Sequence, residues 1–175
     1  MNEKTLLPGN RNYSHKFRTM PIKHPRCGRF VTPIICSICY PLNIKYISRH
    51  IENFHQYFFN LPPDNDYIKW TVGKAMYMAD GTALKQKQAM DENGFYSDII
   101  SSSAVCTIMC DSIRFDEHER KFTYYGTQLI KRRTRDLKRT MVTTGYVENV
   151  PRTRNNPHGL MITNWRTIEN KDLDY

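Results

Sequence analysis

Four residues near the start of the chain are of types that bind zinc: His24, Cys27, Cys36 and Cys39. The last two form a CxxC pair. A structural zinc site usually needs a second ligand pair at suitable spacing, and the candidates, Cys106 and Cys110, stand in a strand-like run. We therefore favour the alternative that the cysteines are small apolar residues in hydrophobic stretches. The sequence predicts no metal site and no cofactor.

The six histidines do not form a recognisable catalytic pattern. There is no HExxH motif, and His50 and His55 are five residues apart in a helical segment, so they do not share a face at ligand spacing. The motifs GxSxG, GxGxxG and the phosphate-binding P-loop are absent as well. We predict that the chain is not an enzyme. The alternative is a small-molecule or catalytic pocket enclosed between helices and a curved sheet.

A basic hairpin is predicted at residues 131–139, where six cations stand with a single acid. Such a tip could contact phosphates, with an affinity that falls steeply as salt is added. The alternative is a solvated hairpin end that attracts an acidic partner protein. Proteins that bind single-stranded nucleic acid have aromatic residues interleaved with their cations, and this segment has none. The candidate phosphate contacts are Lys131, Arg132, Arg133, Arg135, Lys138 and Arg139.

The most specific local pattern is Asn156, Pro157, His158 and Gly159. Proline presets the second position of a type I turn, asparagine can bond its own backbone at the first, and glycine suits the fourth. A tight turn that leads into the last strand explains all of these residues. The functional alternative is a rigid turn that holds an exposed surface for a partner.

Charge is distributed unevenly along the 175 residues. The chain carries a net charge of +9, but residues 1–50 hold nine basic residues and a single acid, so the remainder is nearly neutral. Residues 1–43 contain five of the nine prolines and show no sustained period, which predicts an irregular basic leader. The longest apolar run, residues 30–42, is short and broken by Pro33 and Pro41. As written, the sequence therefore predicts a soluble or peripheral protein.

Apolar residues recur at helical spacing after the leader. Two stripes are predicted to face a core: Ile47, Ile51, Phe54 and Phe58, then Ile68, Val72, Ala75 and Ala79. Pro62 and Pro63 should end the first helix, and we expect Asp80 and Gly81 to end the second. Residues 82–92 predict a third, more polar helix, and residues 95–100 predict one further turn.

The second half of the chain has the composition of strands. Residues 104–115, 122–131, 137–147 and 160–168 are rich in Thr, Tyr, Val and Ile. Short polar links favour antiparallel neighbours. The first strand, with Val105, Cys106, Ile108 and Met109, is predicted to be covered on both faces. Residues 44–173 are thus predicted to form a single α+β domain, with N-terminal helices packed on a curved four-stranded antiparallel sheet.

Several strings in this domain resemble the conjugative transposon TraK proteins: RHIENFHQYFFNLPPDNDYI, MAD, DENGFYSDII, TYYGTQLIKR, RNNPHGLMI and the closing IENKDL. The match covers roughly residues 44–173 in order. Proteins of that family are inner-membrane components of conjugative type IV secretion machines. Their soluble domain is similar to that of the VirB-type assembly factors, so the resemblance implies a nuclear-transport-factor-like (cystatin-like) fold.

The resemblance also implies a function and a location. It implies a non-enzymatic structural protein in the inner membrane that faces the periplasm, associates weakly with itself and contacts other subunits of the transfer channel. An NPxG turn is implicated in assembly contacts of the related factors, and here it falls on Asn156, Pro157 and Gly159. The first helix, through Tyr46 and Tyr57, is the candidate for self-association. The family begins with a cytoplasmic tail and a membrane helix, where this chain has the basic leader. A basic module that binds the transferred DNA is the alternative function.

Overall fold

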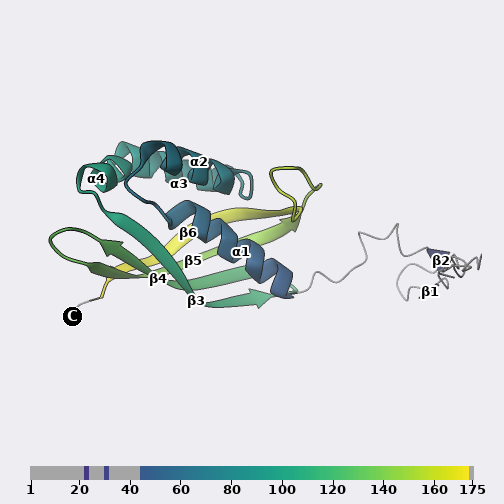
Figure 1. Ribbon diagram of the computed structural model, residues 1–175. Helices are drawn as coiled ribbons and strands as arrows, with labels where there is room; N and C mark the ends of the chain where they lie inside the picture. The colour runs from purple at the N-terminus through teal and green to yellow at the C-terminus, as the bar shows by residue number, and fades with distance from the viewer. Residues whose placement is uncertain (1–21, 24–29, 32–43, 174–175) are drawn as a thin grey trace, which may run out of the picture. The chain divides into compact units, whose positions relative to one another are not determined.

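The computed structural model describes residues 22–23, 30–31 and 44–173 (Figure 1). Contacts divide the chain into two units, Met1–Pro41 and Leu42–Tyr175. In the first unit, β1 (Ile22–Lys23) pairs antiparallel with β2 (Phe30–Val31). The rest of the predicted leader, including His24, Cys27, Cys36 and Cys39, lies outside the described residues.

Four helices open the second unit: α1 (Ile44–Phe59), α2 (Asn65–Met76), α3 (Gly81–Glu92) and α4 (Phe95–Ser101). Pro62 and Pro63 follow α1, as predicted, because proline cannot donate its amide to a preceding turn. Asp64 then caps α2 by accepting a hydrogen bond from the backbone N–H of Tyr67 at 2.8 Å. Within the described residues, no helix combines the length and the apolar character needed to cross a bilayer.

The prediction that Asp80 and Gly81 end the second helix is wrong. Helix α2 already ends at Met76, and Asp80 is the N-cap of α3, where its carboxylate accepts a hydrogen bond from the backbone N–H of Thr82 at 2.9 Å. Gly81 is the first helical residue rather than a left-handed terminus. An aspartate followed by glycine is compatible with either end of a helix, and here the carboxylate decides in favour of a start.

The four remaining strands form one antiparallel meander in the order β3-β4-β5-β6. Each strand pairs with its neighbour in sequence, as the short links predict. Figure 1 shows the helices gathered on one face of this curved sheet, which confirms the predicted α+β class. The strands are β3 (Val105–Asp116), β4 (Lys121–Lys131), β5 (Leu137–Asn149) and β6 (Leu160–Asp172).

Strand β3 is not covered on both faces, so this prediction is wrong. Cys106 and Ile108 are 1% and 5% exposed, whereas Val105 and Met109 are 38% and 55% exposed. The side chains of a strand alternate between two faces, and the helices cover only one face of this sheet. The apolar residues at the start of β3 therefore divide between core and surface.

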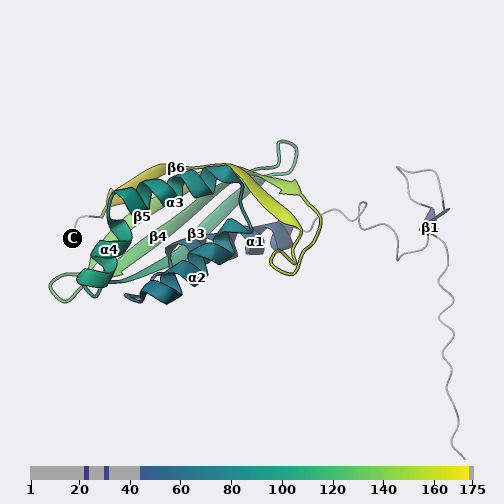
Figure 2. The same cartoon turned by 90° about the horizontal axis from the view of Figure 1, so that it is seen from above.

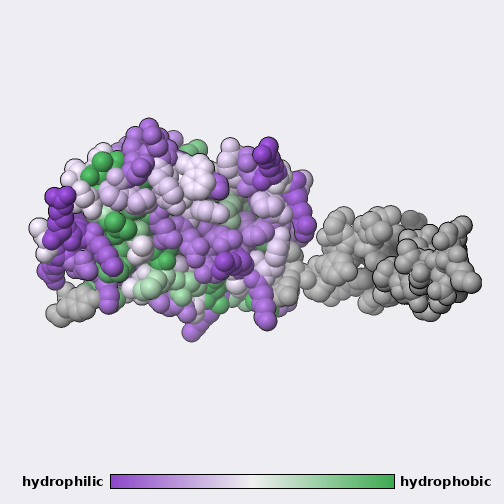
Figure 3. All heavy atoms as spheres, in the orientation of Figure 1, coloured by the Kyte–Doolittle hydropathy of each residue, from purple (hydrophilic) through white to green (hydrophobic). Residues whose placement is uncertain are grey.

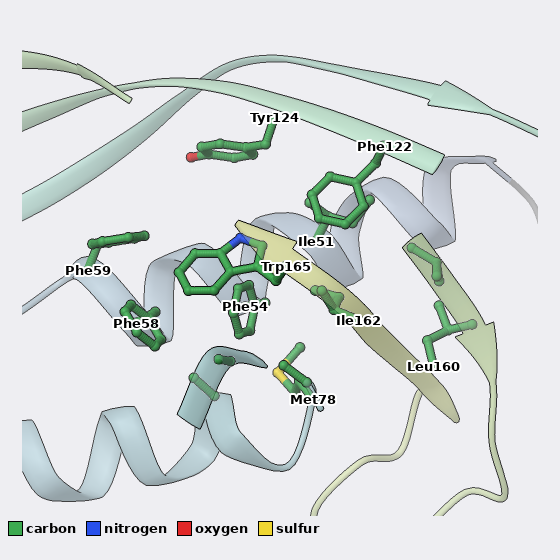
Figure 4. Close-up of a cluster of buried hydrophobic side chains, with 14 of the residues drawn as sticks. Ile51, Phe54, Phe58, Phe59, Met78, Phe122, Tyr124, Leu160, Ile162 and Trp165 are labelled. Atoms are coloured by element: carbon green, nitrogen blue, oxygen red, sulfur yellow. The ribbon is translucent and has the colours of Figure 1, made fainter. Parts of the chain in front are cut away.

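The core lies between α1 and the inner face of the sheet. Ile47, Ile51, Phe54 and Phe58 of the predicted stripe are all buried. Figure 4 shows Trp165 of β6 between the α1 phenylalanines and Tyr124 of β4. The Trp165 ring meets Phe54 edge to face, with centroids 5.0 Å apart. The second stripe, Ile68, Val72, Ala75 and Ala79, is buried as well.

Helices α1, α2 and α3 pack against different elements. Helix α1 packs on β3, α3 packs on β6, and α2 packs on α1 (Figure 2). Backbone pairing also joins the layers, because Leu61 bridges to Cys106 and Ala79 bridges to Ile162. The first bridge pairs with part of the outer edge of β3, and the second pairs with part of the outer edge of β6. Together they fix α1 and α2 over the sheet.

Candidate functional site at the 156–159 turn

The 156–159 turn lies in the loop between β5 and β6 and is held from inside by Asn156. The backbone N–H of Gly159 donates to the carbonyl of Asn156 at 3.2 Å, which closes the turn. The Asn156 side chain does not bond its own turn, since its Nδ2 donates to the carbonyl of Leu160 at 2.7 Å. Asn156 is only 4% exposed, whereas Pro157 is exposed. The turn thus has a buried anchor and an exposed tip.

Gly159 is required by its backbone conformation and by its surroundings. Its φ is +63°, in the left-handed region that glycine adopts without strain. A Cβ at this position would lie 2.7 Å from Cγ of Arg152 and 2.9 Å from the carbonyl oxygen of Val150. The loop before the turn therefore packs where a side chain would stand.

Helix α1 holds the other side of the turn. The hydroxyl of Tyr46 donates to the backbone carbonyl of His158 at 3.1 Å. Nδ1 of His50 lies 3.0 Å from Nδ1 of His158, and their rings meet edge to face with centroids 5.2 Å apart. One of the two Nδ1 atoms must carry the proton that the other accepts. Sequence reasoning missed this pair because its members are 108 positions apart and no local pattern links them.

Both rings of this pair favour the neutral state. Burial first, and then the charge that His158 can carry, lower the pKa of His50 to about 4, and the carbonyl of Met78 opposes this shift only in part. Burial and the charge of Arg152 lower the pKa of His158. At neutral pH the contact between α1 and the turn is thus a bond between uncharged imidazoles.

A pocket of about 590 Å³ opens where α1, α2 and the β5–β6 loop meet. It is lined by His50, Asn53, Tyr57, Lys74, Tyr77, Met78, Arg154, Asn155, Asn156, Pro157 and His158. The predicted site residues Tyr57, Asn156 and Pro157 therefore share one pocket, next to the Tyr46 contact. Within the described part of the chain, no group of three or more His, Cys, Asp or Glu residues could hold a metal ion.

His55, the other histidine of α1, lies inside the core and not at the pocket. Its Nδ1 donates to the carbonyl of Ile51 at 2.7 Å, so its Nε2 must accept the hydroxyl hydrogen of Thr143, also at 2.7 Å. The ring stacks on Tyr124 with centroids 3.8 Å apart. Burial lowers the pKa of His55 to about 3, opposed by the Ile51 carbonyl. This histidine is a satisfied core residue.

The basic hairpin lies at the opposite end of the sheet. In a meander, the β4–β5 link and the β5–β6 link must be at opposite ends, as Figure 1 shows. Arg139 forms an ion pair with Asp172, and its side chain is 29% exposed. Lys138 is half-buried. The exposed cations of the tip are Lys131, Arg132, Arg133 and Arg135.

Comparisons with protein-family models and with curated proteins find no match. Solved structures do match. The VirB8 protein of Agrobacterium tumefaciens superposes with a TM-score of 0.61 at 11% identity, over 75% of this chain and 94% of that one. The soluble domain of TrwG from the type IV secretion machinery of Bartonella grahamii gives 0.59 at 17% identity, over 74% and 96%. A TraE protein in complex with 2-(2-furyl)isonicotinic acid gives 0.61 at 12% identity, over 73% and 96%.

These likenesses define the class of fold. The chain has the nuclear-transport-factor-like α+β fold of VirB8, with helices on one face of an open four-stranded antiparallel sheet. This confirms the fold predicted from the sequence. The matches cover 94–96% of the three solved chains, so the likeness extends over nearly the whole of each solved domain.

Gly159→Ala should destabilise the domain by about 1–3 kcal/mol, because the new Cβ meets the Arg152–Val150 loop and the left-handed backbone is strained. Gly73→Ala is the matched control. Gly73 lies inside α2 with no atom within 4 Å of an added Cβ, so this change should stabilise by about 0.5–1 kcal/mol. Urea denaturation measures both, and equal effects of the two changes would contradict the role of Gly159.

Acid should weaken the fold below pH 6.5, down to about pH 4 for the share of His50 and to about pH 3 for the share of His55. The native state keeps His50 and His55 neutral, whereas the unfolded chain binds a proton at each near pH 6.5. The contribution of these two histidines to the free energy of unfolding is therefore fully present above pH 6.5. It falls as the pH drops, by up to about 1.4 kcal/mol per pH unit for each histidine. Denaturation at several pH values measures this slope. His50→Gln should remove one histidine's share of it, and His118→Gln, at an exposed position, should not.

Proposed function

We propose that this chain is a structural component of a type IV secretion apparatus that works through protein contacts rather than through a reaction. The likeness to VirB8, TrwG and TraE over nearly their whole length is the observation that carries this proposal. TrwG belongs to a type IV secretion machinery, and the ordered TraK-like strings in residues 44–173 point to a conjugative system. The fold itself is shared by many unrelated functions, so the two lines of support are needed together.

The finer assignment is a TraK-family subunit of a conjugative transposon. Its domain would face the periplasm at the inner membrane, in line with the family resemblance. Its partners would be other subunits of the transfer channel and, weakly, a second copy of itself.

The contact surface we propose combines the start of α1 with the 156–159 turn. Pro157 is exposed while Asn156 beneath it is buried and bonded, so the tip is presented in one conformation. Tyr46 is tied to the turn by its hydroxyl and is half-buried. Tyr57 lines the adjoining pocket. A partner that binds here meets a surface that is already ordered, which lowers the entropic cost of association.

Self-association and subunit capture test this proposal. In sedimentation at concentrations up to about 1 mM, we expect a weak dimer whose dissociation constant rises about tenfold in Tyr57→Ala and in Pro157→Ala, as for central contact residues. Tyr146→Ala is the control, because Tyr146 is 38% exposed on β5 and is not among the residues that line the pocket. The same two variants should lose capture of channel subunits from the host cell. A strict monomer that captures no channel subunit would refute the proposal.

The alternative function is direct binding of the transferred DNA by the basic hairpin. It is favoured by the four exposed cations of the tip, none of which forms an ion pair in the described residues. Against it, the aromatic rings on which single strands stack are absent from this tip.

A salt series tests this alternative. If the tip binds single strands, the affinity for a thymidylate oligonucleotide should fall steeply with salt. The joint change of Arg132, Arg133 and Arg135 to Ala should reduce the slope of log K against log salt by about 0.7 per lost phosphate contact. Lys85→Ala, at an exposed position on α3, is the control. A flat salt response, or a slope unchanged by the triple substitution, removes this function.

A further inference from the structure

The outer side of α2 carries three exposed aromatic residues. Tyr67, Trp70 and Tyr77 are 45%, 53% and 54% exposed. Trp70 follows Tyr67 by three residues, and Tyr77, the C-cap residue, follows Trp70 by seven, which places the three along one side of α2 and its C-terminal end. Figure 3 shows hydrophilic residues over most of the viewed face, with hydrophobic ones only in small patches. Exposed Trp and Tyr are the residue types that most often carry binding energy at protein interfaces.

Lys74 lies on the same side of α2, next to the ring of Trp70. Its Nζ is 3.9 Å from the centroid of the Trp70 ring and 5.6 Å from that of Tyr57. It forms none of the ion pairs found among the described residues. The rings therefore hold the ammonium group in place without neutralising its charge.

The aromatic side of α2 continues into the pocket next to the 156–159 turn, because Lys74 and Tyr77 line both. Arg154 is the second cation of the pocket, and no Asp or Glu lines it. Oδ1 of Asn156, an atom of a lining residue that is only 4% exposed, makes no hydrogen bond in the described part of the chain. The pocket thus combines positive charge with unused hydrogen-bonding capacity.

We infer that this surface, formed by Tyr67, Trp70, Lys74, Tyr77 and the pocket, binds an acidic extended segment of another protein. Lys74 and Arg154 recognise a carboxylate of that segment. The amides of Asn53 and Asn155, which line the pocket, can pair with peptide groups that an extended chain leaves free. Trp70 and Tyr77 pack against its apolar side chains. The inference rests on the proposed function in that it takes this end of the domain as a contact site, and it names the chemistry of the partner.

A protein segment fits this surface better than a nucleic acid does. Asp64 and Asp66 stand exposed at the start of α2, next to Tyr67, and would repel phosphates along the same track. A single-stranded nucleic acid that stacks its bases on successive rings needs a continuous positive groove, whereas here the cations are confined to one end of the aromatic side. An acidic segment needs only a local match of charge.

Peptide display on the full chain tests the inference. Random twelve-residue peptides are selected on the wild type, and a selected peptide is then titrated by fluorescence anisotropy. We expect Asp and Glu to be enriched, and the dissociation constant of the selected peptide to rise at least about tenfold in Lys74→Glu and in Trp70→Ala. Lys85→Glu and Leu84→Ala, at exposed positions of α3, are the matched controls and should change it less than about twofold. Circular dichroism checks that each variant is folded.

Three results would overturn the inference: selections without acidic enrichment, peptides that bind Lys74→Glu as tightly as the wild type, or competitive displacement by a ten-nucleotide thymidylate that binds more tightly. The proposed function is judged separately, by sedimentation and subunit capture. Acidic peptides that bind to a chain capturing no channel subunit would refute only the proposed function. Subunit capture without acidic preference at this surface would refute only the inference.

Discussion

The whole domain depends on the packing of α1 across the inner face of the sheet. Phe54 and Phe58 meet Trp165 edge to face at 5.0 and 4.9 Å, and His55 stacks on Tyr124 at 3.8 Å. Aromatic burial of this kind contributes a large share of the free energy of folding in a domain of this size. The same helix carries Tyr46, so the core that fixes α1 also fixes one side of the 156–159 turn.

A small number of hydrogen bonds hold the 156–159 turn against that core. His50 is buried at the border between core and pocket, and its bond to His158 passes the position of α1 on to the turn. A neutral imidazole pair does this without the desolvation cost of a buried ion pair. Asn156 fixes the other side of the turn through Leu160. The exposed tip at Pro157 is thus held in place by the core, which suits the contact proposed for it.

Much of the fold could be predicted because its determinants are local. The apolar spacing of α1 and the short links between strands specify a helix-then-meander order. The errors arose where a local pattern has two meanings. Asp80 can precede or follow a helix, and Val105 can face core or solvent, and only the packed partner decides. The bond between His50 and His158 and the pocket beside it could not be predicted, because they join residues that only the folded chain brings together.

The topology also separates the two surfaces that carry the function proposals. The β5–β6 loop with its turn and the β4–β5 link with its cations must lie at opposite ends of a four-stranded meander. Substitutions at one end therefore leave the contacts of the other in place, and their effects should add. The charges support the same division, because Arg132, Arg133 and Arg135 of the tip are exposed, whereas Lys74 lies against the rings of Trp70 and Tyr57. Cations held against aromatic rings suit a specific protein contact, while a cluster in water mainly provides long-range attraction.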